Sequence, residues 1–171
     1  MIRLRLVVAF AALLLPASLA AGTEVPMPSP KGEVVLTLRG AIDETNQPGA
    51  AAFDLAMLQA LPPVTVTTTT IWTEGEQTFT GVSLKALLDR FDAAGKAVEA
   101  TALNDYFTEI PAEDIVDDGP IVAYMQNGNL LSVRDKGPLW IVYPYDSDGR
   151  WRSEVIYARS IWQLTSITVK P

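Results

Sequence analysis

The stretch Asn127–Asp148, NGNLLSVRDKGPLWIVYPYDSD, holds the densest set of turn and strand signals in the chain. Asn127-Gly128 between two apolar segments predicts a two-residue hairpin, because both turn positions require positive φ. The charged Arg134–Lys136 and a Gly-Pro corner then lead into an apolar strand over Leu139–Tyr143, which Pro144 ends. A charged loop before a buried strand places polar side chains at the rim of a sheet, where they either contact a ligand or are solvated.

Working outward, strands dominate the rest of the chain. Alternating or β-branched residues predict strands over 33–39, 64–72, 98–103, 106–110, 120–126, 129–133 and 160–169. Two short helices interrupt them: Phe53–Leu61, capped by Asp54, and Ser83–Phe91, capped by Ser83. Leu84, Leu87, Leu88 and Phe91 follow helical spacing on one face. Residues 41–49 and 73–77 are polar and predict connections, and residues 111–115 predict one helical turn.

These elements predict an α+β fold with a mixed, largely β core and two or three short helices. No internal repeat is present, and residues 33–171 are expected to form a single domain. Residues 21–32, rich in Pro and Gly, are expected to form an extended leader.

The first twenty residues have the pattern of a secretory signal peptide: Arg3 and Arg5, the apolar run Leu6–Leu15, and small residues up to Ala20. The apolar run is short for a membrane span. We therefore expect a periplasmic or secreted protein without membrane insertion after cleavage, although a retained N-terminal anchor is the alternative.

The chain has no Cys and no His. This composition excludes thiolate nucleophiles, Cys-His metal sites, haem ligation by His and Ser-His-Asp triads. The formal net charge of −7 disfavours nucleic acid as a partner. An enzyme built from this chain would have to use carboxylates, Tyr, Lys, Arg or a bound cofactor.

Four features in fixed order carry a resemblance to a known family. They are Phe79-Thr80-Gly81-Val82-Ser83-Leu84 before a helix, the Asn104-Asp105-Tyr106 turn with Ile110-Pro111, the Asn127-Gly128 hairpin, and Gly137-Pro138-Leu139 before a strand. In this order the sequence, over Val34–Val169, resembles the oxidoreductase molybdopterin-binding domain found in sulfite oxidases. The resemblance implies a sulfite-oxidase-like fold and a pterin cofactor.

The sequence departs from that family at two positions. The family binds molybdenum through a Cys just after the strand that precedes the Phe-Gly corner, and this chain has Thr69, Thr70 and Ile71 there. A threonine hydroxyl does not replace a thiolate ligand. The family also holds the cofactor's phosphate end with a Gly-x-Pro-Leu-Arg run, in which Trp140 occupies the arginine position here. We therefore expect no metal site and no cofactor, with molybdopterin as the alternative.

Two groups of residues are candidate ligand contacts, and no catalytic residue is assigned. Arg134 and Lys136, oriented by Asp135, can bind a carboxylate or phosphate, or can be a solvated loop. The aromatic side chains can surround a flat ring, or can be ordinary core and rim packing. These are Trp72, Tyr106, Trp140, Tyr143 and Tyr145. Asp105 beside Tyr106 is a weaker acid–base candidate, and residues 144–155 do not complete a calcium loop.

The expected function is an exported protein that binds a small ligand or a partner on this fold, without molybdenum redox chemistry. The alternatives are a periplasmic molybdopterin-dependent oxidoreductase, which would hold its cofactor through Arg134, Lys136 and the aromatic residues, and an accessory subunit of a larger periplasmic or membrane protein.

Overall fold

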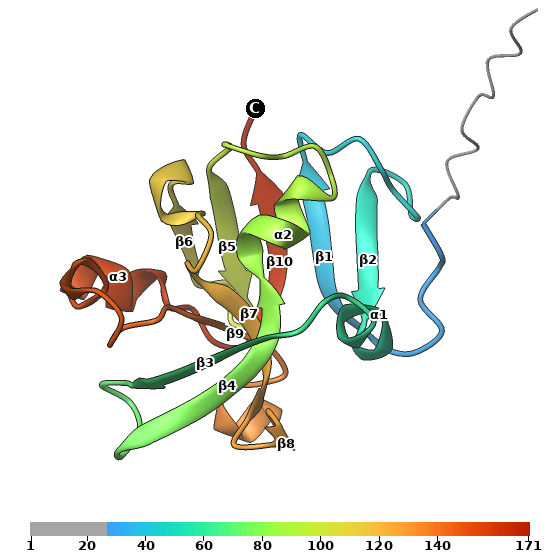
Figure 1. Cartoon of the computed structure of the whole chain (residues 1–171). Coiled ribbons are helices and arrows are strands. Elements are labelled where there is room, and N and C mark those ends of the chain that lie inside the picture. The colour runs from blue at the N-terminus through green and yellow to red at the C-terminus, as the bar shows by residue number, and fades with distance from the viewer. Residues whose placement is uncertain (1–26) are drawn as a thin grey trace, which may run out of the picture.

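The computed structural model describes residues 27–171, so the predicted signal peptide and the first part of the leader lie outside the described residues. Within residues 27–171, ten strands form two five-stranded sheets (Figure 1). This is the α+β, sheet-dominated fold with short helices that the sequence predicts. No helix in the described range is long and apolar enough to cross a membrane.

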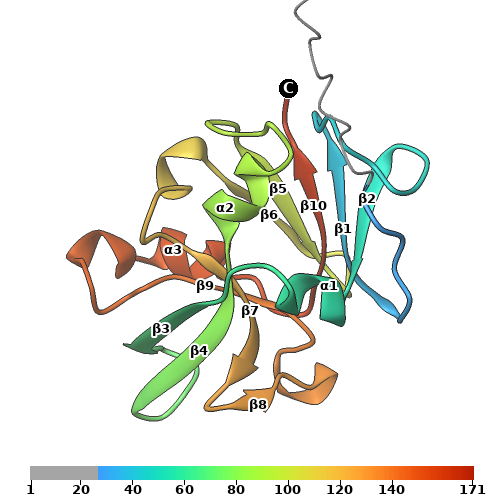
Figure 2. The ribbon, with the colours of Figure 1, turned by 45° about the vertical axis from the view of Figure 1, so that its right-hand side comes forward.

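The first sheet has the order β2-β1-β10-β5-β6. Its strands are β2 (Ala50–Asp54), β1 (Val34–Gly40), β10 (Leu164–Val169), β5 (Val98–Ala102) and β6 (Phe107–Ile110). β1 and β10 pair in parallel, and the other pairs are antiparallel. The alternating residues Leu36 and Leu38 in β1, and Val98 and Ala100 in β5, are fully buried. Helix α2 (Leu84–Asp89) lies in front of this sheet and completes its core (Figure 2).

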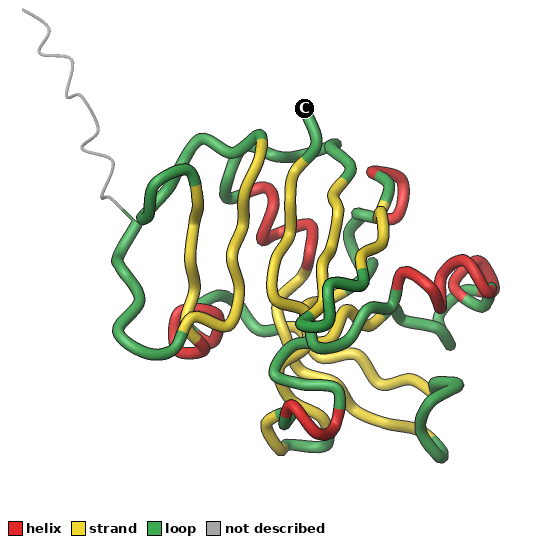
Figure 3. Tube along the Cα trace, turned by 180° about the vertical axis from the view of Figure 1, so that it is seen from behind, coloured by secondary structure: helices red, strands yellow, loops and turns green. Residues whose placement is uncertain are grey.

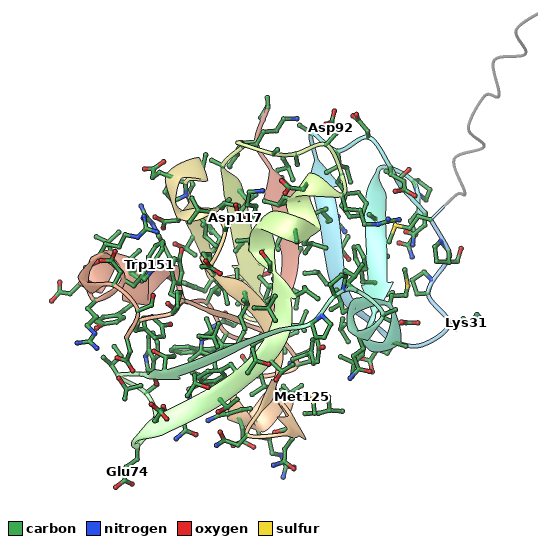
Figure 4. All side chains as sticks on the ribbon, in the orientation of Figure 1. Lys31, Glu74, Asp92, Asp117, Met125 and Trp151 are labelled. Atoms are coloured by element: carbon green, nitrogen blue, oxygen red, sulfur yellow. The ribbon has the colours of Figure 1, made fainter. Side chains whose placement is uncertain are left out.

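The second sheet has the order β3-β4-β7-β8, with β9 also pairing with β7. Its strands are β3 (Val64–Thr69), β4 (Glu76–Ser83), β7 (Ile121–Gln126), β8 (Asn129–Leu130) and β9 (Trp140–Val142). The β3–β4 hairpin extends away from the first sheet (Figures 1 and 3), with Glu74 at its outer tip (Figure 4). β4 lies so close to β7 that a Cβ at Gly81 would collide with the backbone of Val122 and Ala123.

The other two α-helices are short, and each begins at a capping side chain. Helix α1 (Leu55–Gln59) begins at Asp54, whose carboxylate accepts from the N–H groups of Met57, Lys31 and Gly32. Asp54 thereby caps the helix and ties the leader to the domain, and these backbone bonds, that of Gly32 first, lower its pKa. Helix α3 (Glu154–Arg159) begins at the cap Ser153 and lies beside β6 (Figure 1). Met27, in the predicted leader, is buried in the core.

The structure confirms both predicted caps and the Asn127-Gly128 turn, where both residues have positive φ. Several predicted boundaries are wrong. Phe53 lies in β2 and not in a helix, because Ala50–Asp54 pairs with β1 as an edge strand. The strand predicted over 64–72 ends at Thr69, whose own N–H donates to the carboxylate of Asp146. The strand predicted over 160–169 begins only at Leu164, because Gln163 has a positive φ.

Candidate ligand-binding site

A cavity of about 380 Å³ opens where three separate segments of the chain meet, at residues 72, 102–106 and 157–162. The β3–β4 connection contributes Trp72, the end of β5 contributes Ala102, and the β5–β6 turn contributes Asn104 and Tyr106. The remaining wall is α3 and the residues after it. This last segment contributes Tyr157, Ala158, Ser160, Ile161 and Trp162. The lining is therefore mostly aromatic and apolar, and it includes no charged side chain.

Trp72 is the centre of the aromatic cluster at this cavity. Its ring meets Trp162 at 5.6 Å between centroids and Tyr157 at 5.8 Å, both edge to face. Behind it, Trp72 meets Trp140 at 5.7 Å and Tyr145 at 6.2 Å. Edge-to-face aromatic contacts of this kind stabilise a packed arrangement beyond the area they bury. The cavity wall is thus a connected aromatic cluster and not a set of independent surface rings.

A second, smaller cavity of about 230 Å³ lies on the other side of Tyr157. It is lined by Thr69, Thr70, Ile71, Tyr145, Arg152 and Tyr157. Tyr157 lines both cavities, so the two are adjacent. The position at which the family carries its metal-binding Cys therefore faces the smaller cavity.

Asp146 organises the polar side of the smaller cavity. Its carboxylate accepts from the backbone N–H and the hydroxyl of Thr69 and from the guanidinium of Arg152. In return, the N–H of Asp146 donates to the buried Thr68 hydroxyl at 3.1 Å. These bonds, the Thr69 N–H first, hold the pKa of Asp146 below its ordinary value. The Thr69 hydroxyl and the Arg152 charge are thus already occupied within the protein.

Ser160 fixes the wall that follows α3. Its hydroxyl donates to the carbonyl of Ile156 at 2.8 Å and accepts from the Tyr145 hydroxyl at 2.7 Å. Its carbonyl accepts from the indole of Trp140 at 3.1 Å. Burial raises the pKa of Tyr145, so this phenol remains a hydrogen-bond donor at physiological pH. Ser160 therefore links α3 to the strand β9 and to the residues just after it.

Asp114 forms a second buried connection to α3. Its Oδ2 accepts from the Tyr143 hydroxyl at 3.0 Å and from Nη1 of Arg159 at 2.8 Å. Burial, reinforced by the adjacent Asp114 carboxylate, raises the pKa of Tyr143. Because Arg159 lies on α3, this pair helps hold the helix that carries Tyr157 and Ala158 into the cavity.

The structure brings some of the predicted site residues together and separates others. Trp72 and Tyr106 line the large cavity, Trp140 and Tyr145 pack behind Trp72, and Tyr143 is buried against Asp114. The predicted polar loop lies elsewhere: Arg134, Asp135 and Lys136 line neither cavity. Arg134 and Asp135 are exposed, and the ammonium of Lys136 lies 5.6 Å from the Trp140 ring centroid.

Sequence reasoning missed several residues that line the large cavity, most of them in α3 or just after it. Tyr157 and Trp162 complete the aromatic lining, and Asn104 and Ser160 add polar groups. The signal for α3 was local but short, with Ser153 as a capping residue and Glu154 in the first turn. A six-residue helix has too few turns for periodicity to reveal it.

This architecture defines the class of protein: the fold is that of the sulfite-oxidase-like molybdopterin-binding domains. The model of the family described as "Oxidoreductase molybdopterin binding domain" matches residues 36–152, and the chain belongs to this family.

Among solved structures, the chain is similar to the sulfane dehydrogenase SoxCD from Paracoccus pantotrophus, with a TM-score of 0.59 and 18% identity. The similarity covers 79% of this chain and 37% of that chain, so this chain spans well under half of the dehydrogenase's length. No match was found among curated proteins.

The residues at the cavities do not fit a thiolate-bound molybdenum cofactor. The chain has no Cys, and the hydroxyls at the family's ligand position are bonded to Asp146 and, for Thr70, to Thr73. Trp140, at the position of the family's arginine, is fully buried and bonded to Ser160. Among residues 27–171, the only charged side chain that lines either cavity is Arg152, which is paired with Asp146. A phosphate-bearing pterin needs cations that this lining does not supply.

Proposed function

We propose that this chain is an exported binding protein that holds a small molecule in its aromatic cavity and does no molybdenum redox chemistry. The observation that carries the proposal is the cavity itself. It lies beside the position of the family's metal ligand, and its wall is built from aromatic side chains. Its volume of about 380 Å³ falls in the range of small-ligand sites.

The chemistry of the wall supports binding in preference to catalysis. The lining contains no carboxylate, Lys or Arg that could exchange a proton with a substrate. The hydroxyls of Tyr143 and Tyr145, which lie behind this wall, are buried, and burial raises the pKa of both. These phenols brace the site and are poor acids. These observations support a domain that retains the fold of its family and a cavity in that fold. In this domain the cavity binds a molecule other than the molybdenum cofactor.

The test starts from full-length protein purified from its native host. Small molecules released on denaturation are identified by mass spectrometry, and export is checked by cell fractionation. We expect one ring-containing compound to be released in stoichiometric amount, and Trp72→Ala, which removes the centre of the aromatic cluster, to release far less. Leu130→Ala, a change at an exposed residue outside both cavities, is the matched control.

Two results would contradict the proposal. Release of a pterin together with stoichiometric molybdenum would support the alternative, a molybdopterin-dependent oxidoreductase. Protein without any released compound that instead purifies with a larger partner would support an accessory subunit.

A further inference from the structure

We infer that the ligand of the aromatic cavity is an uncharged planar ring compound that carries hydrogen-bond acceptors such as carbonyl oxygens or ring nitrogens. The inference rests on the proposed function and names the class of molecule that the site selects. It follows from three features of the lining: its charge, its rings and its free polar groups.

The first feature is charge. The residues that line the large cavity include no Asp, Glu, Lys or Arg. An ion moved from water into such a site loses hydration without gaining a counter-ion. An anion is further disfavoured by the net charge of −7. Among the described residues, a cation would find no carboxylate in the wall, and the one charged side chain of the adjacent cavity, Arg152, is itself a cation.

The second feature is the set of rings. Trp72, Tyr106, Tyr157 and Trp162 line one cavity, and their contacts hold Trp72, Tyr157 and Trp162 at fixed angles to one another. Ring walls at fixed angles favour flat ligands, which gain stacking and edge contacts with little loss of side-chain freedom.

The third feature is the set of free polar groups. Within residues 27–171, the hydroxyl of Tyr157, the amide nitrogen of Asn104 and the indole nitrogens of Trp72 and Trp162 make no hydrogen bond to the protein. No side-chain nitrogen or oxygen that is buried in a buried or half-buried residue of this range lacks a partner, so the free groups of the half-buried Trp72 and Tyr157 are accessible to solvent, and Asn104 and Trp162 are exposed residues. Each of them can donate. By contrast, the hydroxyls of Ser160 and Tyr106 already donate to backbone carbonyls. The residues that line the cavity therefore carry accessible donors, and a ligand that binds them would have to supply acceptors.

Calorimetric titration of the full chain with four ring compounds of similar size tests this inference. Coumarin is neutral and has a lactone acceptor, and naphthalene has the same two-ring shape without an acceptor. Coumarin-3-carboxylate adds a negative charge, and N-methylquinolinium carries a positive one. We expect coumarin to bind at least tenfold more tightly than either ion and about three- to tenfold more tightly than naphthalene, the range expected for one net hydrogen bond.

A hydroxyl deletion then locates the donor. Tyr157→Phe keeps the ring and removes only the hydroxyl, so it should reduce the preference for coumarin over naphthalene severalfold while naphthalene binding stays unchanged. Tyr124→Phe makes the same deletion at a buried tyrosine outside both cavities and should change neither affinity. Thermal unfolding of both variants confirms that they fold.

The outcomes separate the inference from the proposed function. Binding of several compounds with equal affinity, or tighter binding of either ion, would overturn the inference and leave a binding site of different selectivity. Binding of none of the four, together with no released compound from native protein, would overturn both.

Discussion

Replacing Asp114 with Ala should destabilise the fold chiefly by leaving the Tyr143 hydroxyl buried without an acceptor. Tyr143 is fully buried, and its hydroxyl donates to Asp114 at 3.0 Å. A buried donor that loses its partner costs about 1–3 kcal/mol. Loss of the Arg159 pair, whose guanidinium is 24% exposed, adds at most roughly 1 kcal/mol. We therefore expect Asp114→Ala to lower the free energy of unfolding by about 2–3 kcal/mol.

A double-mutant cycle isolates the contribution of the hydroxyl. Tyr143→Phe removes the donor, so Asp114→Ala made in that background leaves only the Arg159 pair to lose. The two changes should then show a coupling energy of about 1–2 kcal/mol. Urea unfolding of the four proteins, followed by tryptophan fluorescence, measures it. Strictly additive effects would refute the reasoning, because the cost of Asp114→Ala would then not depend on the hydroxyl.

Three further predictions concern the sheet, a carboxylate and the polar loop. Gly81→Ala should lower the free energy of unfolding by more than about 2 kcal/mol, because the added Cβ would collide with backbone atoms. Gly149→Ala is the control and should change the free energy of unfolding little, because nothing lies within 4 Å of its added Cβ. Urea unfolding of both variants measures the two free energies. Because the pKa of Asp146 lies below its ordinary value of 3.8, its contribution to stability is complete above that pH and is lost as the pH falls below it. The difference in unfolding temperature between the natural chain and Asp146→Asn should therefore narrow in acid, and a difference that persists unchanged would contradict this. Arg134→Ala should alter neither stability nor coumarin affinity, because Arg134 is exposed and lines neither cavity; a severalfold loss of affinity in calorimetry would place the ligand at the polar loop instead.

The sequence predicted those elements whose residues carry a strong local pattern. In β1 and β5, buried residues alternate with more exposed ones. In α2, the buried leucines follow helical spacing after the capping serine. β2 was missed because Ala50–Ala52 has neither alternation nor β-branched residues. These three alanines are buried by pairing with β1 and by packing, which is information that only the tertiary fold supplies.

Only part of the cavity lining could be predicted from the sequence. Trp72 and Tyr106 are next to strand ends, and such positions are expected at the rim of a sheet. Tyr157 and Trp162 come from α3 and from the segment after it, more than fifty residues away from Tyr106 along the chain. Their place at the cavity depends on the Ser160 and Asp114 hydrogen bonds to other elements. No pattern around Tyr157 itself signals those bonds.

We propose that this member of the family keeps the fold and its cavity but binds no molybdenum. The most direct test is the molybdenum content of full-length protein purified from its native host, measured by elemental mass spectrometry and expressed per chain. We expect a ratio far below one, because the chain has no thiolate and the family's arginine position is a buried tryptophan. A ratio near one atom per chain would contradict it.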